Sequence, residues 1–211
     1  MKQLIPLLAL VLSGCTHSKP DFSWAKPADR LGFEAKVASY DKLSGLLARC
    51  RAASRMEVFE GLPRPMADQE TWVQESERTD TFLNHDFRFY RPAMQLPSAQ
   101  RSKVLSSVVR DSSFQAWSGP KYCGGFHPDL LVRFHSDSSV LDVHLCFGCG
   151  EAKFIDGPTV AHVDIRDDIV AELRRVQEAC RTKRPQPIRE GPIDALLNHP
   201  GYGGPIPSGN R

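Results

Sequence analysis

The stretch that decides the fold is residues 129–165, DLLVRFHSDSSVLDVHLCFGCGEAKFIDGPTVAHVDI. Apolar and polar residues alternate along it, and turn-forming clusters interrupt the alternation at 136–139, 148–149 and 156–157. Alternation with period two is typical of strands with one buried face, and Asp-Gly between two strands is a strong hairpin signal. The stretch therefore predicts four antiparallel strands joined in sequence order, a meander.

The pairing of the first two strands follows from the position of the turn between them. A four-residue turn at 136–139 places Phe134 opposite Leu141 and Arg133 opposite Asp142. The apolar partners then share one face, and the opposite charges form a cross-strand pair on the other face. Because a shift of one residue would exchange the two faces, this pattern specifies the register.

Helical patterns flank the predicted meander on both sides in the sequence. Residues 39–55, 98–117 and 166–180 carry apolar side chains at spacings of three and four, which is typical of an amphipathic helix. Two further short strands are predicted at 56–62 and 87–90, each closely followed by proline. A sheet with one apolar face needs a second layer, and these helices can supply it. The sequence therefore predicts an α+β fold, a four-stranded antiparallel meander covered by helices on one face.

The N-terminus has the pattern of an export signal. Lys2 precedes an apolar run at 4–12, which is too short to span a bilayer and fits the hydrophobic region of a signal peptide. The run ends in LSGC at 12–15, which resembles the lipobox of bacterial lipoproteins. The resemblance implies cleavage before Cys15, a diacylglyceryl group on its sulfur, and an acyl chain such as palmitate on its amine. Thr16 in place of aspartate implies sorting to the outer membrane, facing the periplasm.

These patterns divide the chain into four parts. Residues 1–14 are the predicted signal peptide, and residues 15–38 are a lipidated tether with few apolar side chains. Residues 39–180 are the predicted single α+β domain. Residues 181–211 contain six prolines and five glycines without periodicity, and they are predicted to be disordered.

The composition excludes some classes of function. The 211 residues include 27 Lys and Arg against 25 Asp and Glu, so the chain lacks the strongly basic balance of a nucleic-acid-binding protein. No P-loop, GxGxxG, GxSxG or HExxH motif occurs in it. The sequence therefore favours a non-enzymatic, lipid-anchored envelope protein with a binding or structural role. Its expected partners are the membrane, through the anchor, and an envelope protein.

Five cysteines remain once Cys15 is assigned to lipid. They are Cys50, Cys123, Cys146, Cys149 and Cys180. Cys123 and His127 are expected near the hairpin end that carries Cys146 and Cys149, which leaves three interpretations. These are a structural disulfide from Cys123 to Cys149 or Cys146, a Cys3His zinc site, and redox chemistry at the C-x2-C pair. Export to an oxidising compartment supports the disulfide, while the place of C-x2-C in a hairpin argues against redox chemistry. A metal-binding or thiol-redox periplasmic protein is therefore the alternative function.

The polar face of the meander offers a second candidate site. A turn at 156–157 places His162 opposite Glu151, which in turn faces Cys146, and His144 lies near them on the same face. This face is predicted to be exposed to solvent, so the cluster is a candidate surface site. Nucleophilic catalysis by Cys146, His162 and Glu151 is one interpretation, and an ordinary polar sheet surface is the other.

The cysteine segments also carry a resemblance to other proteins. YCGGFHPD at 122–129, together with CFGCGE at 146–151, resembles segments of uncharacterised bacterial proteins. That resemblance implies no activity, substrate or cofactor for these residues.

Overall fold

The computed structural model describes residues 20–65, 69–121, 123–137 and 139–185. The helices are α1 (Pro27–Ser39), α2 (Leu43–Ala52), α3 (Gln69–Ser76), α4 (Ser98–Val109) and α5 (Asp167–Cys180). The strands are β1 (Arg55–Glu60), β2 (Thr81–Asn84), β3 (Phe87–Tyr90), β4 (Phe114–Ala116), β5 (Leu130–His135), β6 (Val140–Cys146), β7 (Glu151–Asp156) and β8 (Thr159–Ile165). Two 3-10 turns, Tyr40–Lys42 and Asp111–Ser113, precede α2 and β4.

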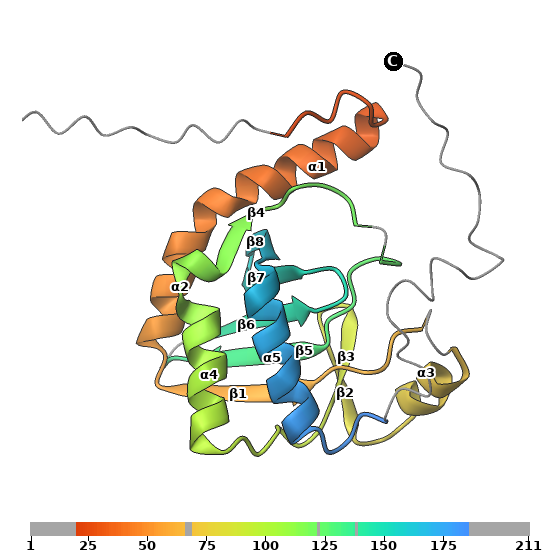
Figure 1. Ribbon diagram of the computed structural model, residues 1–211, viewed down its shortest axis with the longest axis vertical. Helices are drawn as coiled ribbons and strands as arrows, with labels where there is room; N and C mark the ends of the chain where they lie inside the picture. The colour runs from red at the N-terminus through yellow and green to blue at the C-terminus, as the bar shows by residue number, and fades with distance from the viewer. Residues whose placement is uncertain (1–19, 66–68, 122, 138, 186–211) are drawn as a thin grey trace, which may run out of the picture.

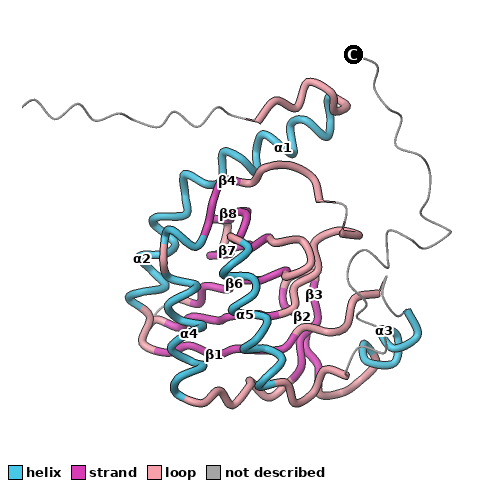
Figure 2. Tube along the Cα trace, in the orientation of Figure 1, coloured by secondary structure: helices cyan, strands magenta, loops and turns pink. Residues whose placement is uncertain are grey.

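The elements form layers, and the predicted α+β class is confirmed. Six antiparallel strands make the main sheet, in the order β1-β5-β6-β7-β8-β4. Helices α2, α4 and α5 cover one face of it (Figure 1), and the separate β2–β3 hairpin packs on the other face. Figure 2 shows the two hairpin strands running across the direction of the main sheet's strands. None of the helices in the described part of the chain is long and apolar enough to span a bilayer.

The main sheet is larger than the sequence predicted. The four-stranded meander is present, but β1 extends it beside β5 and β4 extends it beside β8. The strand β4 lies inside the segment 98–117 that the sequence predicted as helix. Helix α4 ends at Val109, because Arg110 already has extended backbone angles (φ −92°, ψ 121°). Phe114 then pairs with Ile165 and is buried, so packing against β8 outweighs the local helical pattern.

The predicted register is correct for two hairpins and wrong for the third. Leu145 faces Leu130 across β5–β6 and Ala152 across β6–β7, as the turns at 136–139 and 148–149 predict. In the third hairpin the turn lies at Gly157–Pro158 instead of Asp156–Gly157, with Gly157 at a positive φ of 54°. The pairing is therefore displaced by two residues. A displacement of two keeps every side chain on its face, so the alternation in the sequence cannot detect it.

The core lies between the sheet and the helices. Val143 and Phe154 at its centre are fully buried, and the predicted stripe of α2 (Leu43, Leu46, Leu47 and Cys50) packs against them. Ile169, Leu173 and Val176 of α5 join the same core, while Cys180 at the end of that helix is half-buried. In α4 the predicted stripe is only partly correct, because Leu105 is 40% exposed.

The predicted tether is folded over most of the part that the structure describes. Residues 27–38 belong to α1, which lies against β8 (Figure 1), so a tether over 15–38 is wrong for this segment. The helix is held by aromatic packing, with Phe22 5.9 Å and Phe33 5.4 Å from Trp117 between ring centroids. The predicted signal peptide, Cys15 and residues 16–19 lie outside the described residues.

The start of the predicted disordered tail is tied to the domain. The Lys183 ammonium is 2.9 Å from Asp80, and the Lys183 backbone N–H donates to the Glu60 carboxylate at 2.9 Å. Arg184 reaches Asp129 at 2.9 Å. The prediction of disorder over 181–211 is therefore wrong for residues 181–185, which are held by ion pairs and not by an apolar core. Residues 186–211 lie outside the described residues.

Candidate functional site

The polar face of the sheet is covered, contrary to the prediction that it meets solvent. His144 is 0% exposed, Glu151 5% and His162 6%. The β2–β3 hairpin covers His144, while Trp117 and Phe126 pack over His162. The prediction of one surface site from these three residues is therefore wrong. The structure separates them into two clusters.

Glu151 and His162 form one cluster, at the β7–β8 end of this face. Glu151 Oε2 is 3.0 Å from His162 Nε2, and its Oε1 accepts a 2.7 Å hydrogen bond from the Trp117 indole N–H. The pair is diagonal, because Glu151 faces Asp164 and His162 faces Lys153 across the strands. Burial opposes ionisation of Glu151, but the hydrogen bonds from His162 and Trp117 hold its pKa below the usual value. Burial lowers the pKa of His162 against the pull of Glu151, which leaves a neutral ring that donates to a carboxylate.

His144 belongs to a second cluster, beneath the β2–β3 hairpin. Its Nε2 is 2.6 Å from Asn84 Oδ1, and Asn84 in turn donates to Asp142 at 2.8 Å. Asp142 also binds Arg133 at 2.7 Å, the cross-strand pair that the sequence predicted. Burial lowers the pKa of His144 to about 3, so Nε2 donates to Asn84, and Nδ1 is a buried acceptor without a hydrogen-bond partner among the described residues. This cluster is closed and holds the hairpin on the sheet.

The first cluster opens into a pocket of about 190 Å³. Glu151 and His162 contribute to its lining, together with the aromatic rings of Phe33, Trp117 and Phe126. The rings come from α1, the segment after β4 and the segment before β5, so the pocket exists only where these three segments meet. Aromatic walls around a buried polar pair are a common composition for a small-molecule site.

Lysines are the dominant charged groups of this pocket. Lys36 Nζ lies 4.6 Å from the centre of the Trp117 ring, and Lys153 Nζ lies 4.2 Å from the centre of the Phe126 ring. Burial, and then the positive charge of Lys36, lower the pKa of Lys153. Among the described residues neither lysine forms an ion pair, whereas Lys121 is neutralised by Asp164 at 2.9 Å. The pocket therefore presents two mutually repelling ammonium groups without a direct ion pair among the described residues, although Glu151 and Asp86 attract Lys153 from a longer distance.

The sequence identified only part of this pocket. Glu151 and His162 were predicted to be neighbours, while Lys36, Trp117 and Phe126 carry no motif that would single them out. Protein-family models, curated proteins and solved structures yield no match to this chain.

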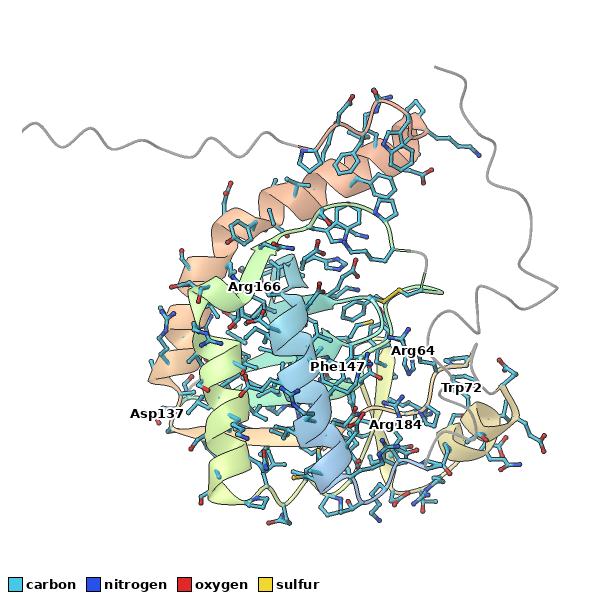
Figure 3. The ribbon with its side chains drawn as sticks, viewed as in Figure 1. Arg64, Trp72, Asp137, Phe147, Arg166 and Arg184 are labelled. Atoms are coloured by element: carbon cyan, nitrogen blue, oxygen red, sulfur yellow. A yellow bond between two sulfur atoms is a disulfide. The ribbon has the colours of Figure 1, made fainter. Side chains whose placement is uncertain are left out.

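The predicted cysteine group lies beside the pocket and contains a disulfide. Cys123 is joined to Cys149, with Cα atoms 5.6 Å apart, and the bond is visible in yellow in Figure 3. Cys146 is a buried free thiol. His127 Nε2 is 2.8 Å from the Leu62 carbonyl oxygen.

These contacts decide between the three interpretations of the group. The structural disulfide is the interpretation that the structure contains, with Cys149 as the partner of Cys123. The structure does not gather the Cys3His set as ligands, because Cys123 and Cys149 are bonded to each other and His127 Nε2 contacts the Leu62 carbonyl oxygen. The C-x2-C pair is not itself bonded. Cys146 faces Glu151 across β6–β7, as predicted, but among the described residues its sulfur hydrogen-bonds with Arg64 and the Cys149 backbone N–H and not with Glu151 or His162. The catalytic set of Cys146, His162 and Glu151 is therefore not assembled.

A buried charge cluster supports the disulfide end of the sheet. Asp129 is 5% exposed and accepts hydrogen bonds from the Phe147 backbone N–H at 2.7 Å and from Arg184 at 2.9 Å. Arg64 lies 3.6 Å from the same carboxylate, and Figure 3 shows Arg64, Arg184 and Phe147 in the same part of the molecule. Burial opposes ionisation of Asp129, but the two arginines hold its pKa below the usual value. A Cβ atom on Gly148 would overlap the Arg64 guanidinium, so a side chain at this position would displace Arg64.

A second depression, of about 470 Å³, lies near the edge strand β1. Phe59, Phe82 and Arg133 contribute to its lining, and the Arg91 guanidinium lies 4.6 Å from the Phe82 ring centre. Arg133 is neutralised by Asp142. This depression is wide and offers fewer unpaired charges than the lysine pocket, so the lysine pocket is the better candidate site.

Proposed function

We propose that this chain is a lipid-anchored protein of the bacterial envelope that binds a small organic anion in the pocket between Lys36 and Lys153. The anchor is Cys15, in the lipobox-like segment at 12–15, and its expected location is the outer membrane, facing the periplasm. The Cys123–Cys149 disulfide supports export, because such bonds persist in oxidising compartments. An envelope protein as a further partner stays a prediction from the sequence.

One observation supports anion binding above the others. Lys36 and Lys153 line the same pocket and neither forms an ion pair among the described residues, and burial and the charge of Lys36 lower the pKa of Lys153 although Glu151 and Asp86 oppose that shift. Like charges in a partly buried site repel strongly, because the local dielectric screens them less than water does. An anion between the two ammonium groups would replace this repulsion with two attractions. Glu151 does not oppose the anion fully, since His162 and Trp117 already hold its carboxylate.

The side chains that line the pocket and its volume indicate the shape and size of the ligand. The rings of Phe33, Trp117 and Phe126 favour a flat apolar body, which gains from stacking and from leaving water. A cavity of about 190 Å³ is smaller than the ~300–1,000 Å³ usual for drug-sized molecules. The pocket therefore fits a single ring that carries one carboxylate.

A titration with benzoate tests this proposal. Binding to residues 16–211 is followed by isothermal titration and compared with benzyl alcohol, which has the same ring and no charge. We expect benzoate to bind and the alcohol to bind at least about tenfold more weakly, a difference of ~1.4 kcal/mol. Lys153→Met keeps the length of the side chain and should weaken benzoate by a similar factor. The exposed Lys42 provides the matched control, and Lys42→Met should leave the affinity unchanged.

Two outcomes of the titration would contradict the proposed anion site. Equal binding of benzoate and benzyl alcohol, or equal effects of Lys153→Met and Lys42→Met, would overturn the anion site. The anchor is tested separately by metabolic labelling with an alkyne palmitate. Wild-type chain should take up the label and Cys15→Ser should not, and a labelled Cys15→Ser chain would overturn the assignment of Cys15.

A further inference from the structure

A third cysteine lies directly beside the disulfide. Cys146 ends β6, and Cys149 is three residues later in the turn before β7. The Cys149 backbone N–H donates to Cys146 Sγ at 3.3 Å, so the free sulfur lies over the residue that carries the disulfide. Residues three apart in a tight turn have Cα atoms within about 7 Å, close to the range that a disulfide can bridge. Cys149 can therefore bond with either neighbour.

A cation links the sulfur of Cys146 to the backbone of Cys123. Arg64 Nη2 donates to Cys146 Sγ at 3.1 Å, while its Nη1 donates to the Cys123 carbonyl oxygen at 3.2 Å. Arg64 is half-buried and ion-paired with Asp129, so it is held in this position. Burial raises the pKa of the Cys146 thiol and Arg64 opposes that rise. A guanidinium at this distance stabilises a thiolate, the form that attacks disulfides.

We propose that Cys146 exchanges with the Cys123–Cys149 disulfide, so that the bond alternates between two partners of Cys149. The Cys146 thiolate attacks Cys149 Sγ, the Cys146–Cys149 bond forms, and the Cys123–Cys149 bond breaks. Cys123 leaves with the electron pair and takes up the proton that Cys146 released. The chain contains one disulfide and one thiol at this site before and after the step, so no oxidant or reductant is consumed.

The exchange changes where the free thiol is located. Cys146 is 0% exposed, whereas Cys123 is half-buried and belongs to the lining of the lysine pocket. The step therefore transfers the thiol from the interior to the pocket wall. There it becomes accessible to thiol-modifying reagents and to mixed-disulfide formation with small thiol compounds. The inference goes beyond anion binding and does not depend on it.

Native labelling with N-ethylmaleimide tests the exchange. The full chain is purified without reductant, labelled at neutral pH, quenched in acid and mapped by peptide mass spectrometry. We expect the label on Cys123 in molecules that contain a Cys146–Cys149 disulfide. Cys146→Ser removes the attacking group, so labelling of Cys123 should fall at least about tenfold. Cys180→Ser, which removes a half-buried thiol at the end of α5, is the matched control and should not change it.

Two outcomes would overturn the proposal. One is absence of label on Cys123 in the wild-type chain, and the other is equal labelling of Cys123 in wild type and Cys146→Ser. A second variant guards against a folding defect in the first. Cys123→Ser should isolate the alternative bond, so Cys146 and Cys149 should be recovered as a disulfide, and recovery of both as free thiols would also overturn it.

The role of Arg64 has its own readout. Arg64→Gln should slow labelling of Cys123 about tenfold at neutral pH, the factor expected when the attacking thiol loses one pKa unit of stabilisation. The difference should disappear at alkaline pH, where the thiol ionises without help. Arg64→Lys keeps the charge and should restore part of the rate. A purely structural role would slow the reaction equally at every pH, and that result would remove Arg64 from the mechanism.

Discussion

Removing the Asp129 carboxylate should destabilise the domain far more than removing an exposed one. Asp129→Ala leaves Arg64 and Arg184 without their shared partner, and their side chains are only 20% and 11% exposed. It also removes the acceptor of the buried Phe147 backbone N–H. Breaking a buried ion pair costs about 3–5 kcal/mol of stability, and this range includes the cost of leaving the Phe147 N–H without an acceptor. We expect the free energy of unfolding to fall by about 4 kcal/mol.

Urea denaturation followed by tryptophan fluorescence measures this loss. With an m-value of about 2 kcal/mol/M, the midpoint should fall by about 2 M. The matched control is Asp168→Ala, whose carboxylate is 63% exposed and pairs with Arg166 at 3.1 Å. Exposed pairs contribute at most about 1 kcal/mol, so this midpoint should move by less than about 0.5 M. Equal midpoint shifts for the two variants would refute the reasoning.

The acid side of the stability curve gives a second check on Asp129. Its pKa is lowered in the folded chain, so its stabilisation is complete above the unfolded pKa of about 4 and is lost as pH falls through the folded pKa. The wild-type chain should lose this contribution below about pH 4, whereas Asp129→Ala has none to lose. The difference between their midpoints should therefore shrink with acidification. A constant difference would show that the carboxylate acts through packing alone.

Three further predictions concern the core, a histidine and a glycine. Phe154→Ala removes a fully buried ring and should cost about 3–5 kcal/mol in urea unfolding. The pKa of His144 is lowered to about 3 in the folded chain, so its contribution to the free energy of unfolding is complete above the unfolded pKa of about 6.5 and is lost as the pH falls. Between pH 7.5 and pH 5 the free energy of unfolding of His144→Leu should therefore fall by about 2 kcal/mol less than that of the wild-type chain. Gly148→Ala should displace Arg64 and cost about 1–3 kcal/mol, whereas Gly45→Ala in α2, where a Cβ meets nothing, should stabilise by about 0.5–1 kcal/mol.

Local patterns predicted the centre of the fold well. The turn at 136–139 and the alternation on either side of it specify the β5–β6 register, including the Arg133–Asp142 pair. The predicted pairing of the third hairpin differs from the observed one by two residues. Asp156-Gly157 and Gly157-Pro158 both suit a turn, and both keep each side chain on the same face of the sheet. β4 was missed because three residues carry too little pattern, and its burial depends on β8.

The candidate site was predicted less completely than the fold. The sequence singled out Cys123, Cys149, Glu151 and His162, since cysteine spacing and strand faces are local properties. It did not identify Lys36, which approaches the sheet because the Phe33 ring beside it in α1 packs on Trp117 in the segment after β4. Contacts of this kind join residues far apart in the chain, and the spacing of residues in the sequence does not predict them.

The sequence by itself determined the α+β class, the central meander and the apolar stripes of α2 and α5, because each depends on the spacing of neighbouring side chains. It also carries the pattern at 1–15 on which the proposed export signal and the proposed lipidation of Cys15 rest. The tertiary structure decided that the polar face is covered, that Cys149 bonds with Cys123, and that Arg64 lies against Cys146. These outcomes depend on which distant segments meet, and that is set by the packing of the whole domain.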